Sequence, residues 1–378
     1  MNINLDFLQN LLKINTYTLN SAGINEACLL IQQELKDTAF IHNIYPSRDN
    51  TFAPLHYYAA AQNDSTKPQI LITGHIDTVF SQQINCDFDE KDNKLYGCGS
   101  MDMKGGIAVI IAILKNLSAT GHLVNVNFML VTDEEQMNVE RYPVMKDICM
   151  RNDYALVYEA RTTSPDNIVK IVIERKGFLG GKLSVTAAGG HSGVITDKSQ
   201  RHSAIHELVF QASNILKLAD FNKGTTINIG KFNGGTAVNA LAQAASIEFD
   251  ARMKTKAEFN RLKAAFGELT NNRQDTSVDI LFELPIYIYP LALNSSTAAL
   301  YQDAVLVGKE LNLVIEQEFR GGGSDANRIR YFNDKIGIID GLGPTGDGEH
   351  TTREYLNLNS LQSSYDFSLA LLTRILKF

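Results

Sequence analysis

The segment ILITGHID, residues 70–77, decides the fold of this chain, because four apolar or β-branched residues run directly into a glycine, a histidine and an aspartate. A short apolar run of this kind predicts a strand that is buried on both faces, as in a parallel sheet. Similar strands are predicted at 126–131 and 154–158. Helical spacing of apolar residues at about 22–37 and 105–118 accompanies them. The fold class predicted is therefore α/β, with a mostly parallel sheet and helices on both faces.

Acidic and histidine residues follow each of these predicted strands, and others lie in a glycine-rich loop and far downstream. The candidates are, in chain order, His75, Asp77, Asp102, Glu134, Glu135, Glu159 and His350. Open α/β sheets place their ligands outside the carboxyl ends of the strands. Imidazole and carboxylate together suit zinc, and two cations in one hydrolytic site need a shared carboxylate between them. The pattern is typical of a two-metal hydrolase.

The size and charge of the chain limit the classes of protein to which it can belong. Its 378 residues are enough for two domains, since single cores stop growing at roughly 250–300 residues. A net charge of −7 argues against nucleic acid or an anionic membrane as a partner. Residues 1–6 lack the basic and apolar regions of a secretory signal, and no apolar run approaches the roughly 20 residues of a membrane span. We therefore expect a cytoplasmic protein.

The cysteines add little to this picture. Cys28, Cys86, Cys98 and Cys149 are widely spaced and form no Cys-x-x-Cys pair. They predict neither a disulfide framework nor a thiolate zinc site, so we expect reduced, partly buried thiols.

The middle of the chain follows a different order of elements. The predicted elements are a strand at 181–187, a helix at 203–218, strands at 225–231 and 244–253, a helix at 257–269 and a strand at 277–283. This β-α-β-β-α-β order is that of a ferredoxin-like α+β unit, and no candidate metal ligand lies in it. We therefore predict a catalytic metal-binding domain of residues 1–176 and 286–378, interrupted by an inserted domain of residues 177–285.

Six short motifs, spread over nearly the whole chain, resemble those of one family. They are GHIDT (74–78), GCGSMDMKGG (97–106), TDEE (132–135), GHSG (190–193), GGTAVN (234–239) and GPTGDGEHT (343–351). In this order they resemble the zinc-dependent aminoacylase and carboxypeptidase family, which includes glutamate carboxypeptidase, acetylornithine deacetylase and succinyl-diaminopimelate desuccinylase. The resemblance extends the prediction from a metal site to a whole enzyme.

The resemblance implies a role for each candidate ligand. One metal ion would be held by His75 and Glu159, the other by Glu135 and His350, and Asp102 would bridge the two. The implied cofactors are two divalent metal ions, most simply zinc, with cobalt or manganese as possible substitutes.

Three catalytic side chains are implied as well. Asp77 would accept a hydrogen bond from the His75 ring and fix its tautomer. Glu134 would be the general base, and because adjacent residues of an extended segment point to opposite sides, Glu135 can bind metal while Glu134 reaches the water. His191 would stabilise the oxyanion of the tetrahedral intermediate, often across a dimer interface. The inserted domain is therefore expected to act as a lid and dimerisation domain in a homodimer.

Four residues resemble positions where relatives bind the carboxylate of the substrate. They are Asn239, Arg252, Gly323 and Ser324. A planar guanidinium suits bidentate recognition of a carboxylate. Arg320 is a weaker candidate, because a surface loop arginine explains it equally well. The expected partner is a small peptide or N-acyl amino acid.

Three functions remain open from the sequence. The first is a glutamate carboxypeptidase-like hydrolase that cleaves an amide or peptide bond next to a free carboxylate, with metal-activated water and a glutamate as general base. The second is a deacylase of the acetylornithine or succinyl-diaminopimelate type. The third, a catalytically silent relative that binds peptides or metal, is disfavoured because Glu134 and the full ligand set are present.

Overall fold

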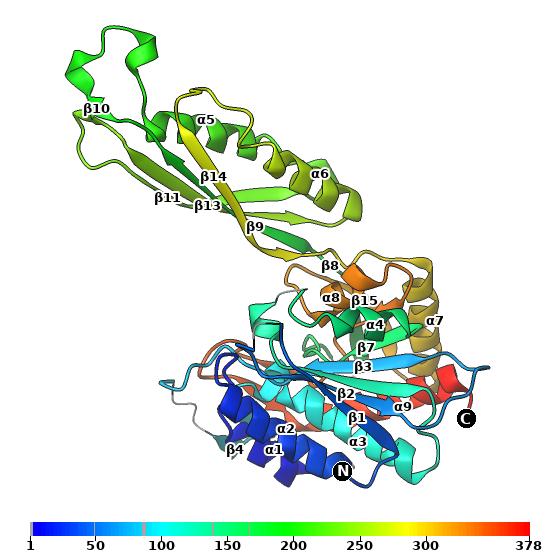
Figure 1. Ribbon diagram of the computed structural model, residues 1–378. Helices are drawn as coiled ribbons and strands as arrows, with labels where there is room; N and C mark the ends of the chain where they lie inside the picture. The colour runs from blue at the N-terminus through cyan, green and yellow to red at the C-terminus, as the bar shows by residue number, and fades with distance from the viewer. Residues whose placement is uncertain (1–2, 49, 85–87, 138–139, 166) are drawn as a thin grey trace. The chain divides into compact units, whose positions relative to one another are not determined.

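A six-stranded, mostly parallel sheet forms the centre of the first unit of the chain (Figure 1). The computed structural model describes residues 3–48, 50–84, 88–137, 140–165 and 167–378. The strand order is β1 (Phe40–Tyr45), β2 (Leu55–Ala60), β6 (Val126–Val131), β3 (Ile70–His75), β7 (Tyr154–Val157) and β16 (Gly337–Ile339). Strands β6, β3, β7 and β16 pair in parallel, while β1 and β2 form an antiparallel edge. Every residue of β3 and β6 is buried, which confirms the predicted fold class.

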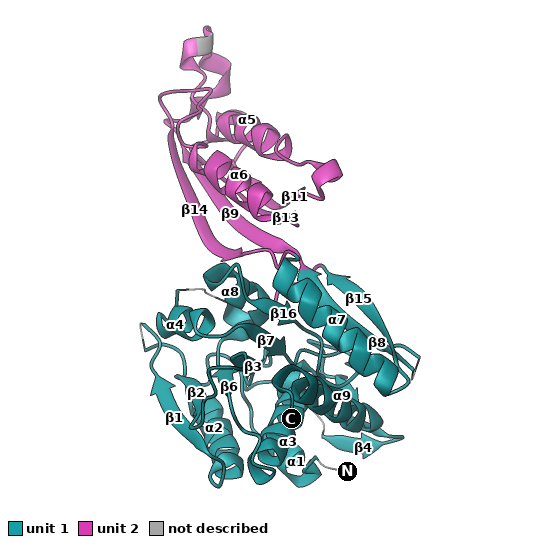
Figure 2. Cartoon of the chain, turned by 90° about the vertical axis from the view of Figure 1, so that its right-hand side faces the viewer, with its two compact units in different colours: residues 1–174, 293–320, 324–378 teal, residues 175–292, 321–323 magenta. Residues whose placement is uncertain are grey.

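Helices cover both faces of this sheet (Figures 1 and 2). One face carries α1 (Leu5–Leu12), α2 (Ser21–Leu35), α3 (Gly105–Ala119) and α9 (Leu358–Leu376), the other carries α4 (Val144–Met150) and α8 (Asp325–Phe332), and α7 (Ser295–Glu310) lies beside β16. A Cβ on Gly106 would lie 2.2 Å from the Tyr158 carbonyl oxygen, so glycine lets α3 begin close to the end of β7. None of the described helices has the length and apolar character needed to cross a membrane.

A small antiparallel sheet joins two loops that are distant in sequence. Its strands are β17 (Gly346–Asp347), β18 (Tyr355–Asn357), β5 (Lys94–Tyr96) and β4 (Asp89–Lys91). Because β18 pairs with β5, the loop before β18, which carries His350, lies beside η1 (Ser100–Lys104), the irregular turn after β5 that carries Asp102. A separate pair is formed by β8 (Ile168–Arg175) and β15 (Val314–Arg320).

The second unit comprises residues 175–292 and 321–323 (Figure 2, magenta). Its main elements are β9 (Gly177–Thr186), α5 (Ala204–Leu216), β11 (Thr226–Gly234), β13 (Ala244–Met253), α6 (Lys256–Gly267) and β14 (Asp279–Ile288). The sheet is antiparallel in the order β11-β13-β9-β14. The unit thus has β-α-β-β-α-β order, and it extends beyond the predicted insertion of 177–285 at both ends.

Candidate metal centre

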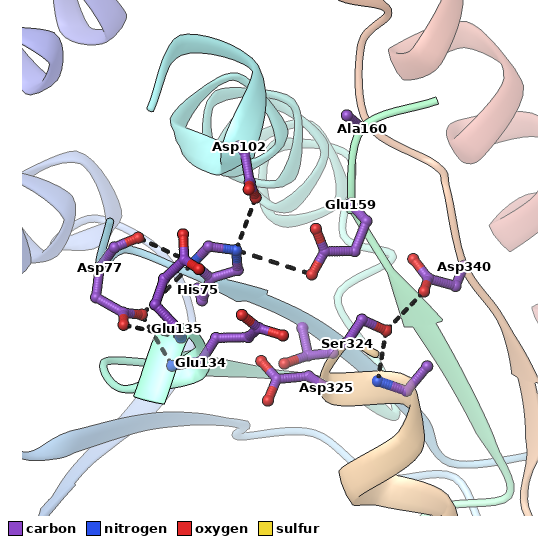
Figure 3. A network of polar contacts seen from close by, with 12 residues as sticks. His75, Asp77, Asp102, Glu134, Glu135, Glu159, Ala160, Ser324, Asp325 and Asp340 are labelled. Atoms are coloured by element: carbon purple, nitrogen blue, oxygen red, sulfur yellow. Dashed lines mark hydrogen bonds and ion pairs between the residues drawn. The ribbon is translucent and has the colours of Figure 1, made fainter. Parts of the chain in front are cut away.

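Three neighbouring strands place the first of the predicted ligands at one edge of the sheet. His75 is the last residue of β3, Glu159 follows β7, and the turn η2 (Glu134–Gln136) follows β6. Since β6, β3 and β7 are adjacent and parallel, their carboxyl ends lie together, as Figure 3 shows. The sequence prediction rested on this property of parallel sheets.

Asp102 lies between two histidine and glutamate pairs. Its Oδ1 is 3.0 Å from His75 Nε2, and Glu159 Oε1 is 3.8 Å from the same nitrogen. Its Oδ2 is 3.3 Å from His350 Nε2, which is also 3.4 Å from Glu135 Oε2. The five residues therefore form two groups of three that share Asp102, each group using a different oxygen of its carboxylate. Two cations bridged by one carboxylate require this arrangement.

The charges of the site fit divalent cations. Asp102, Glu135 and Glu159 are three carboxylates in a largely buried site, and buried carboxylates are costly unless they are paired or coordinate metal. Hydrogen bonds to Asp102 and Glu135 raise the pKa of His350 to about 11. A proton is thus held where a metal ion would otherwise bind the ring, because both need the same nitrogen lone pair.

Glu349 offers a second possible carboxylate beside His350. Asp102, Glu349 and His350 also lie close enough together to hold a cation. However, Glu349 is 4.0 Å from the His350 ring with a side chain that is 58% exposed, whereas Glu135 is 3.4 Å away and 8% exposed. The more buried Glu135 therefore fits the predicted ligand role better than Glu349 does.

Asp77 holds two parts of the site together. Its fully buried carboxylate accepts hydrogen bonds from the amides of Glu134 (3.0 Å) and Glu135 (3.1 Å) and from the Thr18 hydroxyl (2.8 Å). The His75 Nδ1 atom lies 3.0 Å from the main-chain oxygen of Asp77 and 3.4 Å from its carboxylate. The main-chain carbonyl therefore supplies the shorter contact to the ring, while the carboxylate mainly fixes the turn that carries the two glutamates.

Glu134 and Glu135 diverge for a reason other than the one expected. They lie in a 3₁₀ turn rather than an extended segment, so the predicted strand-like alternation is wrong. In a turn with three residues per rotation, neighbouring side chains point about 120° apart. Figure 3 shows Glu135 directed toward Asp102, and Glu134 toward Asp325. Burial raises the pKa of Glu134 well above its usual range, and the nearby carboxylates act in the same direction.

Glu354 is a buried residue of the site that the sequence reasoning missed. Its carboxylate, 1% exposed, accepts hydrogen bonds from the amides of Gly99 (2.8 Å), Met101 (2.8 Å) and Asp102 (2.9 Å). Burial raises its pKa to about 7 even with these bonds. It therefore anchors the main chain of the loop that presents Asp102.

Replacing Glu354 by Gln should lower the affinity for metal. A Gln side chain keeps one acceptor oxygen but turns an NH₂ group toward amides that need acceptors. Loss of a group that orients a ligand typically costs roughly 10 to 100-fold in metal affinity. Competition with a chromophoric chelator would measure the change. Glu349→Gln, at the exposed neighbour of His350, is the matched control, and equal affinities in the two variants would contradict the anchoring role.

A buried arginine, which the sequence did not predict, stabilises the turn that carries Glu134 and Glu135. Arg328, on the unpredicted helix α8, is fully buried and pairs with Asp133 at 2.9 Å and with Asp325 at 3.4 Å. Arg141 also pairs with Asp133, at 2.5 Å. The residue before the two glutamates is therefore fixed by two arginines, one from a distant helix.

Two predicted substrate residues, Gly323 and Ser324, lie directly before helix α8. Ser324 is fully buried; its hydroxyl donates to Asp340 Oδ2 (2.8 Å) and accepts from the amide of Ala326 (3.1 Å), so it caps α8 (Figure 3). Gly323 belongs to the second unit, where its carbonyl accepts from Arg175. The Ser324 hydroxyl is thus already used in hydrogen bonds that stabilise the fold. Its contact with a substrate stays a prediction.

The other predicted contacts lie in the second unit. The Arg252 guanidinium stacks on the Phe178 ring at 4.4 Å and donates to the Gly321 carbonyl at 3.4 Å. Asn239 and His191 are exposed, and the main-chain oxygen of Asn239 accepts from Ser192. All of these side chains are therefore in a unit that contains no predicted metal ligand.

One cysteine departs from the expected reduced state. Cys28 and Cys149 are free and buried, but Cys98 is disulfide-bonded. Cys86 lies outside the described residues. The prediction of reduced thiols is therefore wrong for Cys98, which lies in the loop before Asp102.

Comparison with known proteins agrees with this geometry. Residues 71–374 match the model of peptidase family M20/M25/M40. A succinyl-diaminopimelate desuccinylase of Rickettsia bellii (strain RML369-C) is 25% identical over 95% of this chain and 93% of its own. Carboxypeptidase G2 of Pseudomonas sp. (strain RS-16) is 22% identical over 94% and 85%. A tripeptidase from Staphylococcus aureus subsp. aureus Mu50 has a similar structure, with a TM-score of 0.76, 19% identity and complete coverage of both chains. The chain therefore belongs to peptidase family M20/M25/M40 and is a metal-dependent hydrolase.

Proposed function

We propose that this protein hydrolyses an amide or peptide bond next to a free carboxylate, in the manner of a glutamate carboxypeptidase. The observation that carries the proposal is the position of Asp102, whose two oxygens face His75 with Glu159 and His350 with Glu135. We infer that these five residues hold two divalent metal ions. Zinc suits the mixture of imidazole and carboxylate, and cobalt or manganese would be acceptable substitutes.

The reaction follows from the position of Glu134. Two bound cations would lower the pKa of a shared water toward about 7 and polarise the amide carbonyl. Glu134 takes the proton of the attacking water, and later delivers it to the leaving amine. The raised pKa of Glu134 suits both steps, although nearby cations would lower it again. Asp77 fixes the main chain of the turn, so that Glu134 stays in position between the two transfers.

The second unit supplies the substrate contacts in this proposal. Arg252 and Asn239 would bind the carboxylate next to the scissile bond, together with the turn at Gly323 and Ser324. His191 would donate a hydrogen bond to the oxyanion. Because these residues lie in a unit without predicted metal ligands, we infer a lid and dimerisation role for that unit and a homodimeric enzyme. A cytoplasmic location, expected from the sequence, remains part of the proposal. The substrates would be small peptides or N-acyl amino acids.

A second candidate function is removal of an acyl group from an amino acid. It is favoured by the similarity to a succinyl-diaminopimelate desuccinylase over 95% of the chain. Turnover of acidic dipeptides and of N-acetyl and N-succinyl amino acids by the zinc-loaded protein separates the candidates. Preference for the dipeptides supports the first, and preference for the acyl amino acids supports the second. Hydrolysis of none of them would contradict both.

Metal content should report directly on the ligand set. The zinc-loaded protein is expected to bind close to two equivalents by elemental analysis, because each group of three includes one oxygen of Asp102. Glu135→Gln should lose metal, whereas the exposed control Glu349→Gln should not. Apparent affinity should fall as the pH falls, since His350, with its pKa raised to about 11, must give up its proton to bind. A reproducible content near zero, or affinity independent of pH, would refute the assignment.

A further inference from the structure

A pocket beside the metal centre has no role in the proposed reaction so far. It has a volume of about 520 Å³ and lies within the first unit. Three of its lining residues, Met101, Ala160 and Glu349, are the sequence neighbours of predicted metal ligands. Two arginines, Arg161 and Arg320, also line it. We call it the Arg161 pocket.

Arg161 is a buried cation without an acidic partner among the described residues. It is 6% exposed, and its side chain makes one hydrogen bond there, from Nη2 to the Ser363 hydroxyl at 2.8 Å. Buried charges are normally paired. We therefore expect a bound ligand to supply the anion that pairs with Arg161.

Arg320 is held in a fixed orientation at the same pocket. Its Nη1 donates to the carbonyl of Ala160 at 2.8 Å, and its Nη2 donates to the Thr162 hydroxyl at 3.0 Å and to Glu318 at 3.2 Å. Its side chain is still 21% exposed. A guanidinium that is already ordered loses little entropy when it binds a carboxylate. From the sequence alone, Arg320 could equally well be a surface loop arginine without a role in binding.

Two carboxylates also line the pocket, but they are placed differently. Asp347 and Glu349 are exposed, with 58% exposure for the side chain of Glu349. Solvent screens such charges more strongly than it screens a buried one. The buried wall of the pocket is therefore positive, in spite of the two acidic residues.

We propose that the Arg161 pocket binds a second carboxylate of the substrate, on the acyl side of the scissile bond, with Arg161 as its buried charge partner and Arg320 as a second donor. The inference rests on the proposed function, in which residues of the second unit bind the carboxylate on the amine side. The first unit then receives the acyl group. A dicarboxylic acyl group, or an acidic residue before the scissile bond, supplies the required charge.

The test compares two substrates that differ only in this carboxylate. An N-succinyl amino acid and its N-butyryl counterpart have acyl chains of the same length, and the wild-type enzyme should prefer the succinyl compound in kcat/KM. Arg161→Gln should reduce that preference on the order of 100-fold, as expected when one partner of a buried charge pair is removed. Arg161→Lys keeps the positive charge and should therefore retain part of the preference for the succinyl compound. Arg320→Gln, at a partly exposed site, should also lower the preference.

Controls separate a binding role from damage to the fold. Arg330→Gln changes another buried arginine of the same unit, one that bonds Thr297 and the Asp334 carbonyl, and it should leave the preference unchanged. Equal hydrolysis of both substrates by the wild type, or an unchanged preference in both Arg161→Gln and Arg320→Gln, would overturn the pocket assignment while the proposed function stands. If neither substrate is hydrolysed, calorimetric titration with succinate and butyrate decides. Succinate binding that is lost in Arg161→Gln supports the pocket, and equal or absent binding overturns it.

Discussion

Glu134→Gln is expected to lower turnover about 100-fold or more and to leave the metal content unchanged. The expectation follows from two observations. The side chain points away from Glu135 and Asp102, so it is not placed as a ligand, and its raised pKa indicates a carboxylate that can hold a proton. Gln has the same shape but can neither accept nor return that proton. Single-turnover kinetics on protein with measured zinc content would determine the loss.

Glu135→Gln is the matched control for this prediction. The two residues are adjacent, both in η2, and both have amides held by Asp77. Only Glu135 lies near the His350 ring, at 3.4 Å. The control should therefore lose metal first and activity as a consequence. The assignment of Glu134 as the base and Glu135 as the ligand would be wrong if Glu134→Gln kept most of its turnover. It would also be wrong if Glu134→Gln lost metal as Glu135→Gln does.

The sheet and the clustering of acidic and histidine residues at its strand ends were predictable because both depend on local pattern. Apolar runs such as 70–73 and 126–131 predict buried strands, and the geometry of a parallel sheet then brings the residues after them together. The observed bounds of β6, Val126–Val131, agree with the predicted range. His350 needed more than local pattern, and was assigned through the resemblance to a family.

The residues that support the site could not be predicted in the same way. Glu354 bonds the amide of Asp102 across 252 residues of sequence, and Arg328 bonds Asp133 across 195. Neither pairing leaves a periodic signal, because one charged residue in a loop or a short helix has the same pattern whether it is exposed or buried. Arg161 was missed for the same reason. Burial alone distinguishes these charges from surface ones, and burial is a property of the folded chain.

His191→Ala should lower turnover about 100 to 1,000-fold without loss of metal, the usual effect of removing one oxyanion donor. The ring is exposed, and its Nδ1 accepts a hydrogen bond from the amide of Gly193 at 3.0 Å. That contact places the ring proton on Nε2 and leaves it available as a donor. His191→Gln, which can still donate, should recover part of the turnover. Unchanged turnover in His191→Ala would remove this residue from the mechanism.

Complementation would then show which subunit receives the donor. His191 lies in the second unit, which holds no predicted metal ligand, and Glu134 lies in the first. If the histidine acts on the site of a partner subunit, mixing His191→Ala with Glu134→Gln subunits should restore activity, because a heterodimer contains one site with both groups intact. Subunit exchange must be demonstrated independently, for example by mass spectrometry of differently labelled chains. If subunits exchange but activity does not recover, His191 acts on the site of its own chain. A protein that is strictly monomeric in solution would contradict the proposed homodimer.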